Sequence, residues 1–271
     1  MADLGPGAAA PGNPRGGAGR GVRPEPRHIR RVLVIWAIAT VLGIALVLNL
    51  HRLLPGLLPP MASSEAQGVD FTLGFFTVLA VPVAMLVWVF AAYSIATWRV
   101  RRFEGLDGPP ISGSPVLQTT WILSSALLCL FLVVYGLALL TNVSAAPPGR
   151  LLTVDVTGQQ WQWNFKYPSR GGVTTTTLAL PVNRPILFRV TSLDVDHSFW
   201  IPALAIKIDA IPGEVTTVYA MPTREGTYTA RCAELCGLYH SYMQSRVRVL
   251  SAGGFSSWIG AQERVWGRGG G

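Results

Sequence analysis

The sequence has few charged residues, few cysteines and none of the common nucleotide-binding glycine motifs. Only 13% of the 271 residues are charged whereas 50% are hydrophobic, a balance too apolar for a wholly soluble protein. Three cysteines exclude a framework of several disulfides, and the lack of Cys-x-x-Cys-His excludes an attached c-type haem. The formal net charge of +8 comes without a basic helix or an RNA-reading motif, so we expect no nucleic-acid partner. A lipid membrane explains the composition better.

Three long apolar stretches, at about 32–50, 71–98 and 117–141, contain no Lys, Asp or Glu. Each is close to or above the roughly 20 residues that a helix needs to cross a bilayer. We expect a transmembrane helical hairpin over 70–145. Over 32–54 the pattern fits either a retained transmembrane helix or a signal segment, because basic residues precede it and small residues follow it.

Arginines indicate how these segments are oriented. Several lie at 23–31, the end of an N-terminal segment (1–31) that we expect to be disordered because its first part is mostly Gly, Ala and Pro. Others lie at 99–102, after the second stretch, while the 55–70 loop has no basic residue. Basic residues favour the cytoplasmic side. We therefore expect a multi-pass protein of a bacterial plasma membrane, with its C-terminal half on the outer face.

Residues 146–251 have the pattern of an all-β domain. Short segments rich in β-branched and aromatic residues are separated by Gly and Pro turns, which predicts a sandwich or a Greek-key barrel. The segments are LLTVDVT, QQWQWNFKY, TTTLAL, PILFRVT, TTVYA, TYTAR and SRVRVL. Residues 252–271 form a C-terminal tail with an amphipathic segment, to which we assign no chemistry.

The β domain carries a group of soft metal ligands. Four lie within twelve residues, and a histidine precedes them by thirty-five positions. Two thiolates, two imidazoles and a thioether suit copper, whereas magnesium and calcium prefer oxygen ligands. Because a blue-copper site uses a single cysteine, the second cysteine favours two copper ions bridged by both thiolates. The residues are His197, Cys232, Cys236, His240 and Met243.

Other interpretations of the two cysteines explain fewer residues. A disulfide between Cys232 and Cys236 leaves both histidines and the methionine without a role. Structural zinc usually uses Cys-x2-Cys and rarely methionine. A thiol-disulfide copper chaperone also has Cys-x3-Cys, but on an α/β fold of which this sequence has no pattern.

The strings DVDHSFWIPALAIKIDAIPGE and GTYTARCAELCGLYHSYMQSRVRV resemble the dinuclear-copper signature of cytochrome c oxidase subunit II. The resemblance extends upstream through VTGQQWQWNFKY and two apolar stretches, over about 70–250. It implies transmembrane α-helices followed by an all-β cupredoxin-like Greek-key barrel, with two copper ions in a dinuclear copper A centre. The implied ligands are His197, Cys232, the Glu234 carbonyl, Cys236, His240 and Met243.

The resemblance also implies roles and partners. Trp161 would overlie the copper site and receive electrons from cytochrome c, with Trp163 as a packing residue. The Glu234 carboxylate would reach a magnesium ion shared with subunit I. The loop with Lys207 and Asp209 would face this haem-bearing subunit, which reduces oxygen to water coupled to proton translocation. The chain would act with subunit I and other oxidase subunits in the membrane and show no turnover alone.

Two features depart from the family pattern. Gln118 stands where many relatives have a glutamate near a proton path, so we assign no proton role there. Lys166 and Arg170 stand where acidic residues would face a basic cytochrome c, and residues 146–251 contain ten basic against seven acidic side chains, a net of +3. This predicts a neutral, acidic or complex-tethered donor.

Three related functions share part of this pattern. Quinol-oxidase second subunits have lost the copper ligands that are present here. A nitrous oxide reductase needs a large additional catalytic domain, which this length does not accommodate. A stand-alone membrane-tethered copper electron carrier or chaperone stays open as the alternative.

Overall fold

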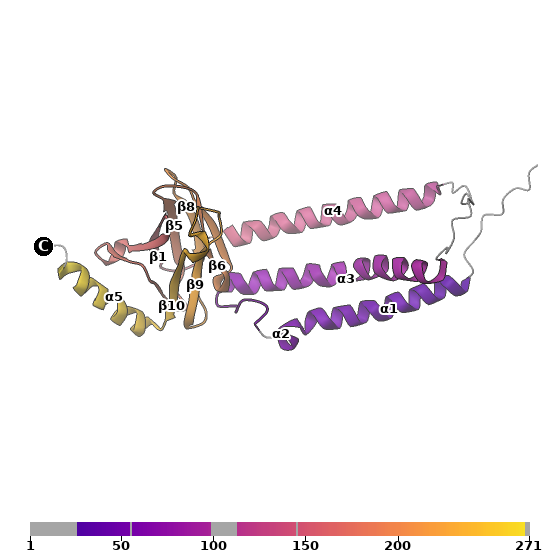
Figure 1. Ribbon diagram of the computed structural model, residues 1–271, viewed down its shortest axis with the longest axis horizontal. Coiled ribbons are helices and arrows are strands. Elements are labelled where there is room, and N and C mark those ends of the chain that lie inside the picture. Colours follow the sequence, from indigo (N-terminus) through magenta and orange to yellow (C-terminus); the bar gives the residue numbers. More distant parts are fainter. Residues whose placement is uncertain (1–25, 55, 99–112, 145, 269–271) are drawn as a thin grey trace, which may run out of the picture.

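The computed structural model describes residues 26–54, 56–98, 113–144 and 146–268. Long helices extend from one end of a β domain (Figure 1). The helices are α1 (Pro26–Leu48), the short α2 (Leu50–Leu53), α3 (Ser64–Trp98) and α4 (Pro115–Ser144). By length and composition α1, α3 and α4 are each able to cross a membrane. Residues 1–25, which we expected to be disordered, lie outside the described residues, as do the arginines at 99–102.

Two of these helices begin before the apolar stretch that predicted them. Helix α1 starts at Pro26, so residues 26–31, which we assigned to a disordered segment, are helical. Proline is favoured at the first helical position, and the arginines that follow are good helix formers. Helix α3 starts at Ser64, several residues before the apolar stretch at 71–98, and its first turns consist largely of polar and small residues next to the β domain. Hydrophobicity marks where a helix is apolar and does not mark where it begins.

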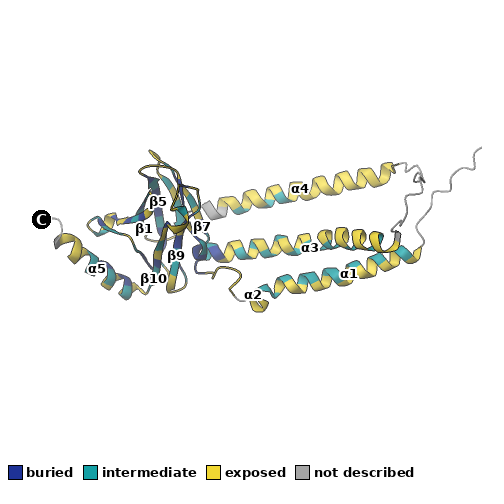
Figure 2. Ribbon diagram, viewed as in Figure 1, coloured by how far each residue is buried: buried dark blue, intermediate teal, exposed yellow. Residues whose placement is uncertain are grey.

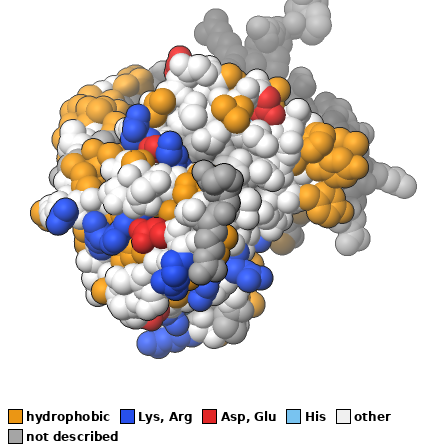
Figure 3. Space-filling view, turned by 90° about the vertical axis from the view of Figure 1, so that its left-hand side faces the viewer, with side chains coloured by type: hydrophobic (Ala, Val, Ile, Leu, Met, Phe, Trp, Pro, Cys, Tyr) orange, Lys and Arg blue, Asp and Glu red, His pale blue; other side chains and the backbone are white. Residues whose placement is uncertain are grey.

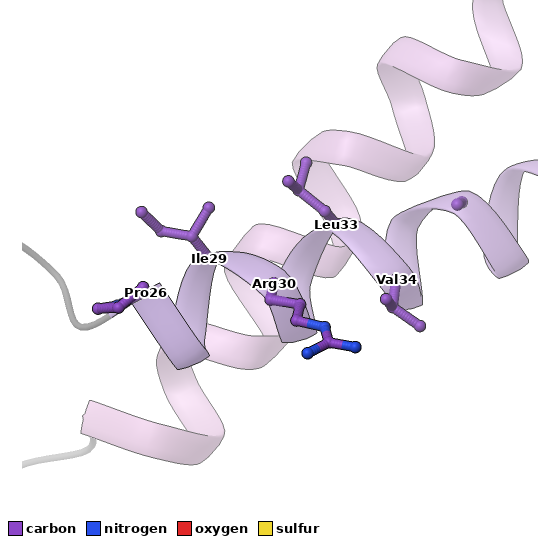
Figure 4. A pocket seen from close by; sticks show the side chains of 6 residues that line it. Pro26, Ile29, Arg30, Leu33 and Val34 are labelled. Carbon is purple, nitrogen blue, oxygen red and sulfur yellow. The ribbon is translucent and has the colours of Figure 1, made fainter.

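Helix α1 packs closely against α3. Trp36 donates a hydrogen bond from Nε1 to the carbonyl of Pro82 at 2.8 Å, and a Cβ on Gly43 would lie 2.8 Å from Val81. Most remaining helical side chains are exposed (Figure 2). Near the start of α1, Ile29, Leu33 and Val34 line a mostly apolar pocket together with Arg30 (Figure 4). The three helices therefore present apolar surface of the kind that lipid or another membrane subunit covers.

The β domain consists of two five-stranded sheets, which confirms the predicted class of helices followed by an all-β domain. The first sheet has the order β3-β2-β1-β5-β8 and the second β4-β10-β9-β6-β7. Pairing is antiparallel except for β1 with β5 and β10 with β4. The strands are β1 (Leu152–Gln159), β2 (Gln162–Tyr167), β3 (Val173–Thr175), β4 (Leu178–Pro181), β5 (Ile186–Ser192), β6 (His197–Ile201), β7 (Ile206–Ala210), β8 (Thr216–Ala220), β9 (Gly226–Cys232) and β10 (Gln244–Leu250).

Alternate residues of the strands fill the core between the sheets. Burial in β1 follows a strict period of two. The predicted segment TTTLAL is divided between β3 and β4, which belong to different sheets. Tyr167 spans this division: its hydroxyl donates to the carbonyl of Ala179 at 3.0 Å and accepts from the Ala179 amide at 2.9 Å. Helix α5 (Ala252–Arg268), where we expected a tail, buries Phe255 and Ile259 against the core.

The start of α3 is attached to the β domain. Ser63 is fully buried, and its hydroxyl donates to the carbonyl of Leu204 at 2.7 Å. The backbone of Ala62 donates to Ala203 and accepts from Thr223, both at 2.8 Å. Side-chain and backbone hydrogen bonds thus join the helix to two different loops of the β domain.

Candidate metal centre

Strand pairing brings together the two chain segments that carry the soft ligands. Cys232 ends β9 and Met243 precedes β10, and the Cys232 amide donates to the Met243 carbonyl at 3.0 Å, which closes the loop between them. His240 begins a 3-10 turn (His240–Tyr242) inside this loop. His197 begins β6, which pairs with β9 so that Phe199 lies opposite Cys232. The sheet therefore delivers His197 to the loop from the neighbouring strand.

The donor atoms form a continuous chain of short separations. Cys232 Sγ lies 3.8 Å from His197 Nδ1 and 3.8 Å from Cys236 Sγ. Cys236 Sγ lies 3.6 Å from His240 Nδ1 and 3.8 Å from Met243 Sδ. The carbonyl oxygen of Glu234 is 3.2 Å from Cys232 Sγ. All six predicted ligand groups meet at one place.

These separations fit metal ions bound between the atoms. A first-row metal lies about 2.3 Å from a thiolate and about 2.0 Å from an imidazole nitrogen, so a sulfur and a nitrogen 3.6 to 3.8 Å apart can share one ion. Ligand atoms of His197, Cys232 and Cys236 all lie within 4.8 Å of one another. Burial, and next the neighbouring Cys232, raise the pKa of the Cys236 thiol to about 12. Two thiolates at this position require nearby positive charge, which bound metal ions supply.

An Asp194 carboxylate holds the outer nitrogen of His197. His197 is fully buried, and its Nε2 lies 2.9 Å from Asp194 Oδ1. The carboxylate also accepts from the amides of Gln160 and Val195, each at 2.7 Å. Burial raises the pKa of this carboxyl, but the hydrogen bonds from Gln160, His197 and Val195 outweigh it and lower the pKa to about 2. Asp194 is therefore ionised at neutral pH and fixes the orientation of the ring.

Gln160 connects this carboxylate to the other ligand segment. Its amide nitrogen Nε2 donates to the carbonyl of Cys236 at 2.8 Å. The next residue, Trp161, packs on the core with its ring 4.9 Å from that of Tyr239, and a Cβ on Gly237 would lie 3.4 Å from Trp161. The predicted electron-receiving tryptophan thus lies against the loop that carries Cys236.

Trp163 lies beneath the site. It is fully buried, 5.2 Å from Phe199 and 5.9 Å from His197 between ring centroids. Gly158 leaves room for this arrangement, since a Cβ there would lie 3.0 Å from Trp163 and 3.1 Å from His197.

Four residues to which the sequence or the family resemblance drew attention are exposed. The Glu234 residue is exposed, as are Lys207 and Asp209 on β7. Gln118 is exposed near the start of α4, a long helix away from the β domain (Figure 1). Sequence reasoning did not identify Asp194 or Gln160, although a carboxylate three positions before His197 was a usable signal.

The segments that carry the candidate ligands lie in a region shared with a known protein family. A family profile described as the periplasmic domain of cytochrome c oxidase subunit II matches residues 172–250. Cytochrome c oxidase subunit 2 of Thermostichus vulcanus is 31% identical over 258 residues, which are 75% of this chain and 77% of that protein. The subunit from Synechocystis sp. is 28% identical over 252 residues, 76% of each chain.

A solved periplasmic domain of cytochrome oxidase subunit II from Bradyrhizobium japonicum shares 32% sequence identity. It covers 44% of this chain and 98% of its own length, with a TM-score of 0.42. The identity and coverage shared with the full-length relatives show that this chain belongs to the cytochrome c oxidase subunit 2 family.

Proposed function

We propose that this chain accepts electrons from cytochrome c at a dinuclear copper A centre and passes them to haem in subunit I of a respiratory oxidase. Subunit I would reduce oxygen to water coupled to proton translocation. The convergence of two thiols, two imidazoles, one thioether and one carbonyl supports this most directly. When bound, the two copper ions supply a one-electron redox site with low reorganisation energy.

The proposed ligand roles follow from the positions of the donor atoms. Cys232 and Cys236, with sulfurs 3.8 Å apart, would bridge both ions. His197 and His240 each approach a different thiol and would bind one ion each. Met243 and the Glu234 carbonyl would be weak outer ligands, and the exposed Glu234 carboxylate would bind magnesium shared with subunit I.

Trp161 would receive the electron. Its ring packs beside Tyr239 and against the segment that carries Cys236, and Leu235 and Leu238 of the same segment are 80% and 81% exposed. Exposed apolar side chains that lie together mark a site of protein interaction.

The membrane placement rests on the arrangement of the helices. The arginines at the start of α1 lie at the end of the helices far from the β domain (Figure 1). With these arginines in the cytoplasm, the β domain would lie on the outer face of a bacterial plasma membrane. The tight packing of α1 on α3 favours a retained third transmembrane helix over a cleaved signal.

The donor is proposed to be neutral, acidic or tethered to the complex. The end of the β domain opposite the helices exposes more Lys and Arg than Asp and Glu side chains (Figure 3). Association rates with donors of different charge, measured against ionic strength, test this. A preference for a basic cytochrome c that salt abolishes would contradict it.

The main experiment is purification of the membrane complex in mild detergent. We expect two copper ions per chain, co-migrating haem, and a seven-line copper hyperfine pattern by electron paramagnetic resonance. A four-line pattern would mean a single copper. Copper-loaded chain without haem would favour the alternative, a stand-alone membrane-tethered carrier or chaperone.

A further inference from the structure

A polar pocket lies on the β domain beside helix α5. Its volume is about 440 Å³, within the usual range for binding pockets. Its walls come from β2, β10, α5 and the threonines at 174–177, and none of the soft ligands lines it. Helix α5 lies at the end of the β domain opposite the long helices (Figure 1). The pocket is therefore on the side of the domain away from the membrane helices.

The pocket contains two cations and no acid. Arg246 and Arg248 lie two positions apart on β10, so their side chains leave the strand on the same face. Neither guanidinium forms an ion pair or a side-chain hydrogen bond within the described part of the chain. Lys166 is exposed beside the pocket, because it pairs with Thr174 of the pocket wall. Cations this close repel one another, so an anion among them is stabilising.

The rest of the wall suits a protein partner. Asn164 accepts a hydrogen bond from Gln162 at Oδ1, and its amide nitrogen has no partner within the described residues. Trp258 is half-buried, with its ring 5.9 Å from that of Tyr167. Arginine binds carboxylates through two parallel hydrogen bonds, and Arg and Trp are among the residues that contribute most to protein interfaces.

The pocket also lies close to the proposed point of electron entry. Asn164 is three residues after Trp161, so it is at most about 11 Å away. Arg246 follows Met243 by the same interval. One side of a standard interface, about 800 Å², is about 30 Å across. A single partner can therefore cover both Trp161 and the arginines.

The surroundings of the pocket are basic and separate from the surface expected to face subunit I. Lys207 and Asp209 lie on β7, three strands and about 14 Å from β10 in the second sheet. Glu263 follows Gln262 on α5 but does not line the pocket. The end of the domain opposite the helices shows more Lys and Arg than Asp and Glu side chains (Figure 3). An acidic partner surface complements this one.

We propose that this pocket is the docking point for acidic side chains of the electron donor, with Arg246 and Arg248 binding its carboxylates. The inference rests on the proposed function and narrows it, because it requires a donor with a negatively charged surface. These cations would raise the association rate and orient the donor on Trp161.

Charge reversal of the two arginines, R246E/R248E, tests this docking, and R246Q/R248Q removes the charges without adding new ones. R150E/R224E is the matched control with the same change in net charge. Arg150 and Arg224 are exposed and do not line the pocket. Arg224 adjoins Thr223, whose amide binds Ala62 at the base of α3.

The assay is stopped-flow reduction of copper in the purified oxidase complex by c-type cytochromes of negative, neutral and positive net charge. With the acidic cytochrome at low ionic strength, we expect R246E/R248E to lower the second-order rate about tenfold or more. R246Q/R248Q should lower it by a smaller factor, and R150E/R224E by less than about twofold. Reduction of copper by a small-molecule reductant should be the same in all variants, which shows that the metal centre is intact.

Equal rates in wild type and R246E/R248E, or equal losses in R246E/R248E and R150E/R224E, would overturn the proposal. Saturable binding of inorganic phosphate that R246Q/R248Q abolishes, with unchanged cytochrome rates, would also overturn it and assign the pocket to a small anion. A wild-type complex that contains copper and haem but accepts no electrons from any cytochrome would instead refute the proposed function itself.

Discussion

Replacing Asp194 with Asn removes the charge that lies 2.9 Å from Nε2 of His197 and keeps the side-chain size. An ionised carboxylate stabilises the more positive, oxidised form of a metal centre, so D194N should raise its reduction potential. Through the ring and a bond of about 2.0 Å, the charge is about 7 Å from a metal at Nδ1. At an effective dielectric constant of about 20, the interaction energy of two unit charges at this distance is about 2.4 kcal/mol. Because the Asp194 side chain is 32% exposed, water screens the interaction, and we expect about half of this energy. For a one-electron couple, this corresponds to a rise of about 50 mV in the reduction potential.

The substitution also puts an amide NH2 group in place of one carboxylate oxygen, where it faces the N–H of either His197 or Gln160, and this weaker support of the ring should lower copper affinity about 10- to 100-fold. A redox titration and a copper titration against a chelator, both on the full chain in detergent, measure the two effects. Asp196→Asn is the matched control, because Asp196 is exposed in the same loop and its carboxylate has no hydrogen bond within the described residues. Equal shifts in both variants, or no change in D194N, would refute the reasoning.

Three further predictions concern the packing around the site. Gly158→Ala would place a Cβ 3.1 Å from His197, so we expect about 1–3 kcal/mol of destabilisation in urea unfolding and an altered copper spectrum, whereas Gly253→Ala, in open space on helix α5, should neither destabilise the protein nor alter the spectrum. Trp161→Phe should slow electron uptake in stopped-flow mixing and leave the copper spectrum intact; an unchanged rate would remove its proposed role. Tyr167→Phe leaves the buried Ala179 groups unpaired and should cost about 1–3 kcal/mol in urea unfolding.

The sequence predicted the elements whose pattern is local. The apolar stretches located three helices, and chemistry and spacing predicted a group of five candidate ligand side chains that the fold brings together. Helix starts were missed at Pro26 and Ser64, because the polar residues there are helical without being apolar. The division of TTTLAL between two sheets depends on which strands pair, a long-range property.

The surroundings of the ligands were harder to predict for the same reason. Gln160 contacts Cys236 across seventy-six positions, and its backbone contacts Asp194 across thirty-four. Neither contact follows from spacing, because each depends on how β1 and β2 lie relative to β6 and β9. The amphipathic segment at 252–268 has the pattern of a helix, but its sequence does not show that Phe255 packs against Tyr167 of the β domain.

The attachment of α3 to the β domain determines how freely the metal centre can move. A membrane helix joined by a long linker would let the domain swing, so its distance from a neighbouring subunit would vary. Here Ala62 and Ser63 are buried and hydrogen-bonded to two loops, directly before the helix begins. The helix therefore holds the β domain in a fixed position relative to the membrane. The proposed electron transfer to a partner subunit would then occur over one fixed distance.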